Sequence, residues 1–130
     1  MPQDVGTQGS KLLIVDDSKV SRLRIRAFFA LHCPSWEVKE ASTGDEAITM
    51  SQEFRPDFVT MDVNMPGMSG FEAAPQIIAG NQRVRVVILT ANIQESSRQM
   101  AASLNLSFVA KPATEASLQQ ALDFLLAGRP

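Results

Sequence analysis

Short runs of β-branched and aromatic residues alternate along the chain with longer segments whose apolar side chains recur at helical spacing. The short runs predict five strands, at Leu12–Val15, Trp36–Glu40, Phe58–Met61, Val84–Leu89 and Phe108–Ala110. The longer segments predict five helices, at Lys19–Leu31, Thr43–Phe54, Gly70–Ala79, Gln94–Leu104 and Thr114–Leu126. Strands that alternate with helices are typical of a parallel sheet with helices on both faces. The pattern therefore predicts an α/β domain built from repeated strand–helix units.

For three of the expected helices, the sequence also predicts how the helix packs or where it is distorted. In Lys19–Leu31, one apolar stripe is expected to face the core; it consists of Val20, Leu23, Ala27 and Leu31. Pro75 lies inside Gly70–Ala79 and is expected to kink or distort that helix. The segment Gln94–Leu104 has few apolar residues, so we expect it to be the least firmly docked helix.

Composition narrows the class of protein. A chain of 130 residues is the size of one domain, and we expect a disordered lead at residues 1–10 before a folded domain at 11–127. The net charge of −2 argues against a nucleic-acid binder. The longest apolar run, Ala27–Leu31, is too short to span a membrane, and the only cysteine, Cys33, has no disulfide partner. These features favour a cytoplasmic protein without a membrane anchor.

Polar residues follow four of the expected strands. Asp16 and Asp17 come after the first strand, Asp62 after the third, Thr90 after the fourth and Lys111 after the fifth. In sheets of this kind the functional crevice lies at the carboxyl ends of the strands. We therefore expect three carboxylates, a hydroxyl and an ammonium group to meet at one edge of the sheet.

Such a cluster has a specific chemistry. Two like charges 4 Å apart repel by about 4 kcal/mol at an effective dielectric constant of 20, and a divalent cation relieves this repulsion. Mg²⁺ prefers oxygen ligands and commonly uses one or two carboxylates together with a phosphate oxygen. Asp16 and Asp17 would hold the metal, while Lys111 and Thr90 would contact an anion near Asp62. Asp62 is then equipped to attack a phosphoryl group as a carboxylate nucleophile.

These motifs resemble those of response-regulator receiver domains, and the resemblance extends from Lys11 to Leu126. It rests on an apolar strand followed by Asp16 and Asp17, on the stretch 61–70 (MDVNMPGMSG), on Thr90-Ala91 and on Lys111-Pro112. The resemblance implies a flavodoxin-like, doubly wound parallel sheet of five strands in the order 2-1-3-4-5, with five helices. It also implies a single-domain response regulator. Such a protein is not an enzyme but a phosphoacceptor that assists its own phosphorylation and dephosphorylation.

The same resemblance implies roles for individual residues. Asp62 is the expected phosphoacceptor, and Lys111 contacts the phosphoryl group. Mg²⁺ or Mn²⁺ is expected on Asp16, Asp17, Asp62 and the backbone carbonyl of Asn64. Thr90 and Phe108 are the expected switch residues, and the Lys111–Pro112 peptide bond is expected to be cis.

The resemblance also implies partners. A histidine kinase or a phosphotransfer protein would be the donor. An output protein would bind the face made by the fourth helix, the fifth strand and the fifth helix. No nucleic-acid or membrane partner is expected, and the chain would be a monomer or a weak dimer.

Several alternatives stay open. One alternative is a receiver domain excised from a longer regulator or hybrid kinase. A phosphohydrolase with an aspartate nucleophile would need an acid two residues after Asp62, where Asn64 has no proton to give. A flavin-binding module would need a phosphate loop after the first strand, where Asp16 and Asp17 would repel phosphate. Phe108 is as well explained as a core aromatic as it is as a mobile switch.

Overall fold

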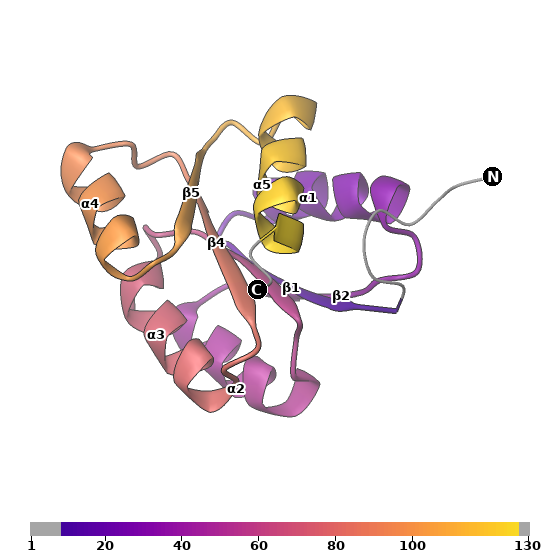
Figure 1. Ribbon diagram of the computed structural model, residues 1–130, viewed down its shortest axis with the longest axis horizontal. Helices are drawn as coiled ribbons and strands as arrows, with labels where there is room; N and C mark the ends of the chain where they lie inside the picture. The colour runs from indigo at the N-terminus through magenta and orange to yellow at the C-terminus, as the bar shows by residue number, and fades with distance from the viewer. Residues whose placement is uncertain (1–8, 128–130) are drawn as a thin grey trace.

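A computed structural model describes residues 9–127 as one parallel sheet between two layers of helices (Figure 1). The strands are β1 (Lys11–Val15), β2 (Glu37–Ala41), β3 (Phe58–Met61), β4 (Arg85–Thr90) and β5 (Ser107–Ala110). The helices are α1 (Lys19–His32), α2 (Gly44–Phe54), α3 (Gly70–Gly80), α4 (Glu95–Ser103) and α5 (Glu115–Ala127). The strand order is β2-β1-β3-β4-β5 and every pair is parallel, which confirms the expected doubly wound, flavodoxin-like topology.

The two faces of the sheet bury separate hydrophobic clusters. Successive residues of a strand point to opposite faces, so Leu12 and Ile14 pack with α1 and α5, whereas Leu13 and Val15 pack with α2, α3 and α4. Figure 1 shows the same division, with α1 and α5 together on one side of the sheet. Because β1, β3 and β4 lie between the two clusters, their side chains are almost wholly buried, and the strand ends are held rigidly.

The apolar stripe expected on α1 does not face the core. Val20, Leu23 and Leu31 are 61%, 53% and 69% exposed. The buried face is made instead by three other residues of the helix, Ile25, Phe28 and Phe29. Both stripes have helical spacing, and the helix buries the one with two phenylalanine rings because these remove more apolar area from water.

Aromatic packing holds this face of α1 against the sheet. The Phe29 ring is stacked on Trp36 with their centroids 5.8 Å apart. Trp36 is in turn stacked on Phe58 at 4.8 Å. This column ties α1 to the start of β2 and to β3, and it explains why α1 turns its aromatic face inward.

Helix α3 continues through Pro75 without a break. Pro75 lies on the exposed side of the helix, and the segment from Gly70 to Gly80 remains helical. The helix begins with a capping box, in which the Ser69 hydroxyl accepts from the Glu72 amide and the Glu72 carboxylate accepts from the Ser69 amide. This reciprocal cap stabilises the first turn of the helix, which precedes Pro75.

Helix α4 is short and buries little of its surface. Only Ser97 and Ala101 among its residues are buried, and Gln94 makes no side-chain cap. These observations agree with the expectation that it is loosely docked.

Most of the expected N-terminal lead, residues 1–8, lies outside the described part of the chain. Gly9 and Ser10 do contact the start of β2: the Gly9 amide donates to the Ser35 hydroxyl, and the Ser10 carbonyl accepts from Glu37. Within residues 9–127, no helix has the length and apolar character needed to cross a membrane.

Gly70 allows the start of α3 to approach the end of β3. A Cβ atom at Gly70 would lie 2.0 Å from the carbonyl oxygen of Asp62, so no larger residue fits without displacement. The Gly70 amide donates to the Val63 carbonyl at 2.9 Å. This close contact fixes the backbone that carries Asp62.

Candidate functional site

Three carboxylates from two strand ends come together at the carboxyl edge of the sheet. Asp16 and Asp17 follow β1 and Asp62 follows β3, and one oxygen of each lies within 4.8 Å of the others. Asp16 and Asp62 are buried, whereas Asp17 is exposed. The donor set consists of carboxylate oxygens, which suit a hard cation such as Mg²⁺. The convergence expected from the strand order is therefore present.

Lys111 reaches this cluster from the end of β5. Its Nζ atom donates to Asp16 Oδ2 at 2.5 Å and lies 3.4 Å from Asp62 Oδ2. The Lys111–Pro112 peptide bond is cis, as the resemblance implied. One ammonium group thus serves two buried carboxylates, and it lies closer to Asp16.

The first turn of α1 orients Asp16. The Ser21 hydroxyl donates to Asp16 Oδ2 at 2.6 Å, and the Ser18 amide donates to Oδ1 at 2.9 Å. Arg22 Nη1 donates to the Asp16 carbonyl at 2.7 Å, and its Nε donates to Glu40 at 2.9 Å. Both the side chain and the backbone of Asp16 are therefore tied to the helix that follows it.

Burial raises the pKa of Asp62 above the ordinary value for an aspartate, and the nearby charge of Asp16 adds to this effect. The Thr90 hydroxyl, the Lys111 ammonium group and the Val63 amide act in the opposite direction. The Val63 amide donates to Asp62 Oδ1 at 2.7 Å and so orients the carboxyl group. Asp62 is held in a defined geometry, but its ionised form is destabilised by burial.

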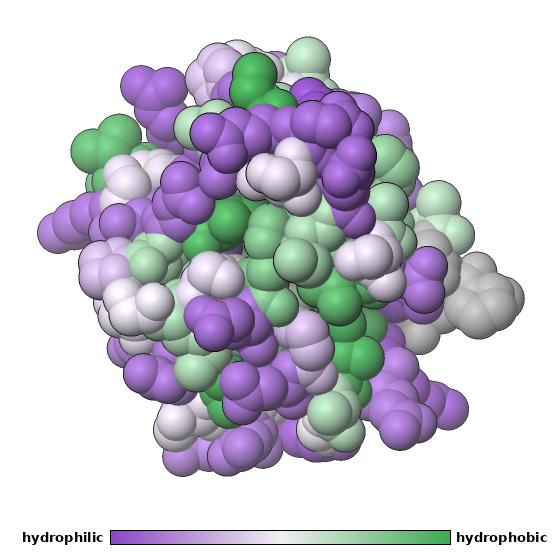
Figure 2. All heavy atoms as spheres, turned by 90° about the vertical axis from the view of Figure 1, so that its left-hand side faces the viewer, coloured by the Kyte–Doolittle hydropathy of each residue, from purple (hydrophilic) through white to green (hydrophobic). Residues whose placement is uncertain are grey.

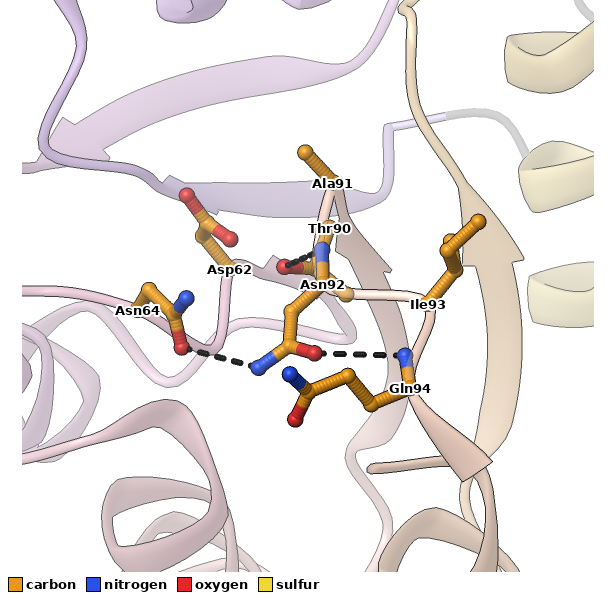
Figure 3. A pocket seen from close by; sticks show the side chains of 7 residues that line it. All are labelled: Asp62, Asn64, Thr90, Ala91, Asn92, Ile93 and Gln94. Atoms are coloured by element: carbon orange, nitrogen blue, oxygen red, sulfur yellow. Dashed lines mark hydrogen bonds between the residues drawn. The ribbon is translucent and has the colours of Figure 1, made fainter. Parts of the chain in front are cut away.

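A cavity of about 390 Å³ opens beside Asp62 (Figure 3). Its lining consists of Asp62, Asn64, Thr90, Ala91, Asn92, Ile93 and Gln94. Asn92 Nδ2 donates to Asn64 Oδ1 at 3.2 Å, and this bond joins the loops that follow β3 and β4. Asn92 also donates from its backbone amide to Thr90 Oγ1 at 3.2 Å. The expected site residues Asp62, Asn64 and Thr90 therefore line one opening.

Phe108 lies away from this cavity. It is half-buried on β5 and packs against the cluster on the α2–α4 side of the sheet. The guanidinium group of Arg98 on α4 lies over its ring, 4.8 Å from the ring centroid. The structure places Phe108 between the sheet and α4, which is compatible with both open interpretations of this residue.

Sequence reasoning did not identify Ser21 and Arg22 as part of the site. Both lie in the first turn of α1, where a serine and an arginine more commonly face solvent. The only available signal was the spacing of Ser21, three residues after the helix cap Ser18 and five after Asp16. That spacing becomes informative only when the start of the helix is known.

Comparison with known proteins agrees with this geometry. The family model for the response regulator receiver domain matches residues 12–123. Protein PilH of Pseudomonas aeruginosa is 30% identical over 122 residues, which cover 92% of this chain and 99% of PilH. The uncharacterized transcriptional regulatory protein YhcZ of Bacillus subtilis is 38% identical over 81 residues, which cover 62% of this chain and 38% of YhcZ.

A solved structure gives the same result. The two-component response regulator of the LuxR family from Aurantimonas sp. SI85-9A1 is similar with a TM-score of 0.82 and 30% identity. The match covers 94% of this chain and 88% of that one. The parallel sheet has the order β2-β1-β3-β4-β5, and an acidic cluster with a lysine lies at its carboxyl edge. The family model also spans most of the sequence. The chain therefore belongs to the response regulator receiver domain family.

Proposed function

We propose that this chain accepts a phosphoryl group on Asp62 from a histidine kinase or a phosphotransfer protein and thereby changes its affinity for an output protein. One observation carries this proposal: Lys111 Nζ lies within reach of both Asp16 and Asp62 beside a cluster of three carboxylates. A carboxylate surrounded by a cation, a metal site and a hydroxyl has the parts needed for an aspartyl-phosphate.

In the transfer step, an oxygen of Asp62 attacks the phosphorus of the donor's phosphohistidine. A P–O bond forms while the P–N bond breaks, and the imidazole leaves with the electron pair of that bond. The Val63 amide orients Asp62, and the Lys111 ammonium stabilises negative charge on the phosphoryl oxygens. Thr90 and Ala91 line the opening through which the donor would reach Asp62.

The acidic cluster fits Mg²⁺ or Mn²⁺. The three carboxylates of Asp16, Asp17 and Asp62 would hold the ion. The backbone carbonyl of Asn64, which the family resemblance implies as a ligand, would complete the protein's part of the site. When bound, the ion neutralises repulsion among the carboxylates and the phosphoryl oxygens.

The output surface is proposed at α4, β5 and α5. Met100 on α4 and Phe124 on α5 are 46% and 38% exposed, and Ile93, in the loop just before α4, is 55% exposed. Figure 2 shows the side of the molecule that carries α4, where hydrophobic side chains interrupt a hydrophilic surface. Phe108 on β5 contacts Arg98 of α4, and Thr90 ends β4 just before the loop that leads into α4. Movement of these two residues after phosphorylation would therefore alter this surface.

The remaining parts of the proposal concern the setting. We propose a folded domain at 11–127 that acts in the cytoplasm as a monomer or a weak dimer and does not contact nucleic acid or membrane. The full-length match to PilH supports a single-domain regulator, whereas YhcZ is a protein in which this chain covers only 38% of the length. Action as one domain of a longer regulator is therefore the second possibility.

Intact-mass spectrometry tests the phosphoacceptor. The chain is incubated with acetyl phosphate, or with a phosphorylated histidine-containing donor domain, in the presence of Mg²⁺ or of EDTA. We expect one added phosphoryl group in the wild type with metal and none in Asp62→Ala or with EDTA. Asp123→Ala on α5 is the matched control, since this aspartate is exposed and remote from the cluster, and it should behave as wild type. An adduct that persists in Asp62→Ala, or a wild type that accepts nothing from either donor, contradicts the proposal.

A further inference from the structure

Ser21 makes a contact that the proposed function leaves unused. It lies in the first turn of α1, and its hydroxyl donates to Asp16 Oδ2 at 2.6 Å. Its backbone amide donates to the hydroxyl of Ser18, which caps the same helix. The Ser21 side chain therefore contacts the buried Asp16 carboxylate from a backbone position that is fixed in the first turn of α1.

Asp16 is held by three side-chain hydrogen bonds of two different kinds. The Ser18 amide and the Ser21 hydroxyl belong to α1, which follows Asp16 directly. The third donor is the ammonium group of Lys111 at the end of a long, flexible side chain, and it shares Oδ2 with Ser21. Two donors are thus fixed in place and one is able to move.

The position of Lys111 indicates which donor moves. Its Nζ lies 2.5 Å from Asp16 and 3.4 Å from Asp62, so without a phosphoryl group it favours Asp16. A phosphoryl group brings a charge of about −1.5 to −2 and strong acceptor oxygens to Asp62. That charge draws Lys111 toward Asp62, and among the described contacts the Asp16 carboxylate then loses its only charged donor, because Arg22 donates to the backbone carbonyl of Asp16.

We infer that Ser21 is a positioning residue for the metal ligand Asp16. Its neutral hydroxyl keeps the carboxylate in one orientation while Lys111 passes from Asp16 to the phosphoryl group. The inference rests on the proposed function, because it assigns Ser21 a part in the same metal and phosphoryl site.

The physical reason is preorganisation. A ligand that is already oriented binds a cation without the loss of side-chain freedom that a rotating carboxylate would suffer. Groups that hydrogen-bond to metal ligands commonly change metal affinity 10- to 100-fold when they are removed. The three carboxylates of the cluster remain when the Ser21 hydroxyl is removed, so this removal should alter the affinity for the ion while leaving those carboxylates in place.

The test compares the Mg²⁺ affinity of the full chain in four forms, measured by isothermal titration calorimetry without a phosphodonor. Ser21→Ala removes only the hydroxyl, since the backbone bond to Ser18 remains. Ser21→Thr keeps the hydroxyl. Ser96→Ala is the matched control, because Ser96 is an exposed serine in the first turn of α4. A second readout is the rise in melting temperature with Mg²⁺ concentration, which follows from binding to the native state. Melting curves in EDTA show whether each variant folds.

We expect the dissociation constant for Mg²⁺ to rise about tenfold in Ser21→Ala and to return close to the wild-type value in Ser21→Thr. Ser96→Ala should equal the wild type. Wild-type affinity in Ser21→Ala would overturn the inference, and so would equal weakening in Ser21→Ala and Ser21→Thr. Either result, obtained with a wild type that still takes up phosphoryl on Asp62, leaves the proposed function standing. A wild type that binds no Mg²⁺ and accepts no phosphoryl group overturns both.

Discussion

The guanidinium group of Arg98 lies over the ring of Phe108, 4.8 Å from its centroid, and so joins α4 to β5. A contact of this kind contributes about 0.5–1 kcal/mol where it is partly solvated. Since α4 buries little else than Ser97 and Ala101, this contact is a substantial part of what docks the helix.

Arg98→Ala should therefore loosen α4 and broaden the rotamer distribution of Phe108. We expect faster amide hydrogen exchange in α4 and β5, measured by NMR, with little change in β1 or β3. Gln99→Ala, on the exposed side of the same helix, is the control. Unchanged exchange in Arg98→Ala would mean that the ring contact does not hold the helix.

The raised pKa of Asp62 predicts how stability depends on pH. The native state binds this proton more tightly than the unfolded chain, because burial disfavours the ionised carboxylate. Its contribution to stability is present at low pH and is lost as pH rises from the ordinary aspartate value through the raised native value. Asp62→Asn removes this loss and leaves Lys111 paired with Asp16.

In metal-free buffer, Asp62→Asn should have a larger free energy of unfolding than wild type at neutral pH. The advantage should shrink as pH falls through the native pKa. Urea unfolding at several pH values measures this difference, with Asp123→Asn as an exposed control. A variant less stable than wild type at neutral pH would show that the Lys111–Asp62 attraction outweighs burial.

Thr60 carries a buried hydroxyl without a hydrogen-bond partner among the described residues. It is 1% exposed and lies in β3 between Ile14 and Val87, so its hydroxyl faces apolar neighbours. An unsatisfied buried polar group costs about 1–3 kcal/mol. Thr60→Val keeps the shape and should raise the free energy of unfolding by about 1 kcal/mol in urea titrations. Thr49→Val, at an exposed position of α2, should give no gain. A less stable Thr60→Val would indicate that the hydroxyl is satisfied in solution.

The two faces of α1 should differ sharply in their tolerance of substitution. Ile25 is 1% exposed and Leu23 is 53% exposed on the same helix. Ile25→Ala should lower the free energy of unfolding by about 2–5 kcal/mol because it leaves a cavity. Leu23→Ala should lower it by less than about 1 kcal/mol. Equal losses in the two variants would contradict the observed orientation of the helix.

Gly70 and Gly67 test the approach of α3 to Asp62. Gly67 has a φ of 78°, and a Cβ atom added there would meet no neighbouring atom. Gly67→Ala should therefore lower the free energy of unfolding by about 1–2 kcal/mol through backbone strain alone. Gly70→Ala forces a Cβ atom against the Asp62 carbonyl, so it should lower the free energy of unfolding by more than Gly67→Ala does. It should also shift the amide resonances of Asp62 and Val63, whereas Gly67→Ala should leave them nearer their wild-type positions. Similar spectra for the two variants would argue against the close approach.

Much of the fold follows from local pattern. The spacing of apolar residues distinguishes a strand from a helix. The bounds expected for the five strands therefore differ from the observed bounds by at most one residue at each end. Strand ends also indicate where chemistry gathers in a parallel sheet. The strand ends therefore predict that Asp16, Asp62, Thr90 and Lys111 lie close together, and the structure confirms their proximity.

Tertiary packing decided what local pattern left ambiguous. The sequence of α1 holds two apolar stripes, and only the aromatic column through Trp36 and Phe58 selects the Phe29 stripe over the Leu23 stripe. The anchoring of Asp16 by Ser21 also depends on where the helix begins relative to the strand end. Periodicity is a property of neighbouring residues, whereas the face that α1 buries depends on Phe58, which is distant in the chain. The Asp16 carboxylate likewise needs Lys111, 95 residues away, in addition to its neighbours in the first turn of α1.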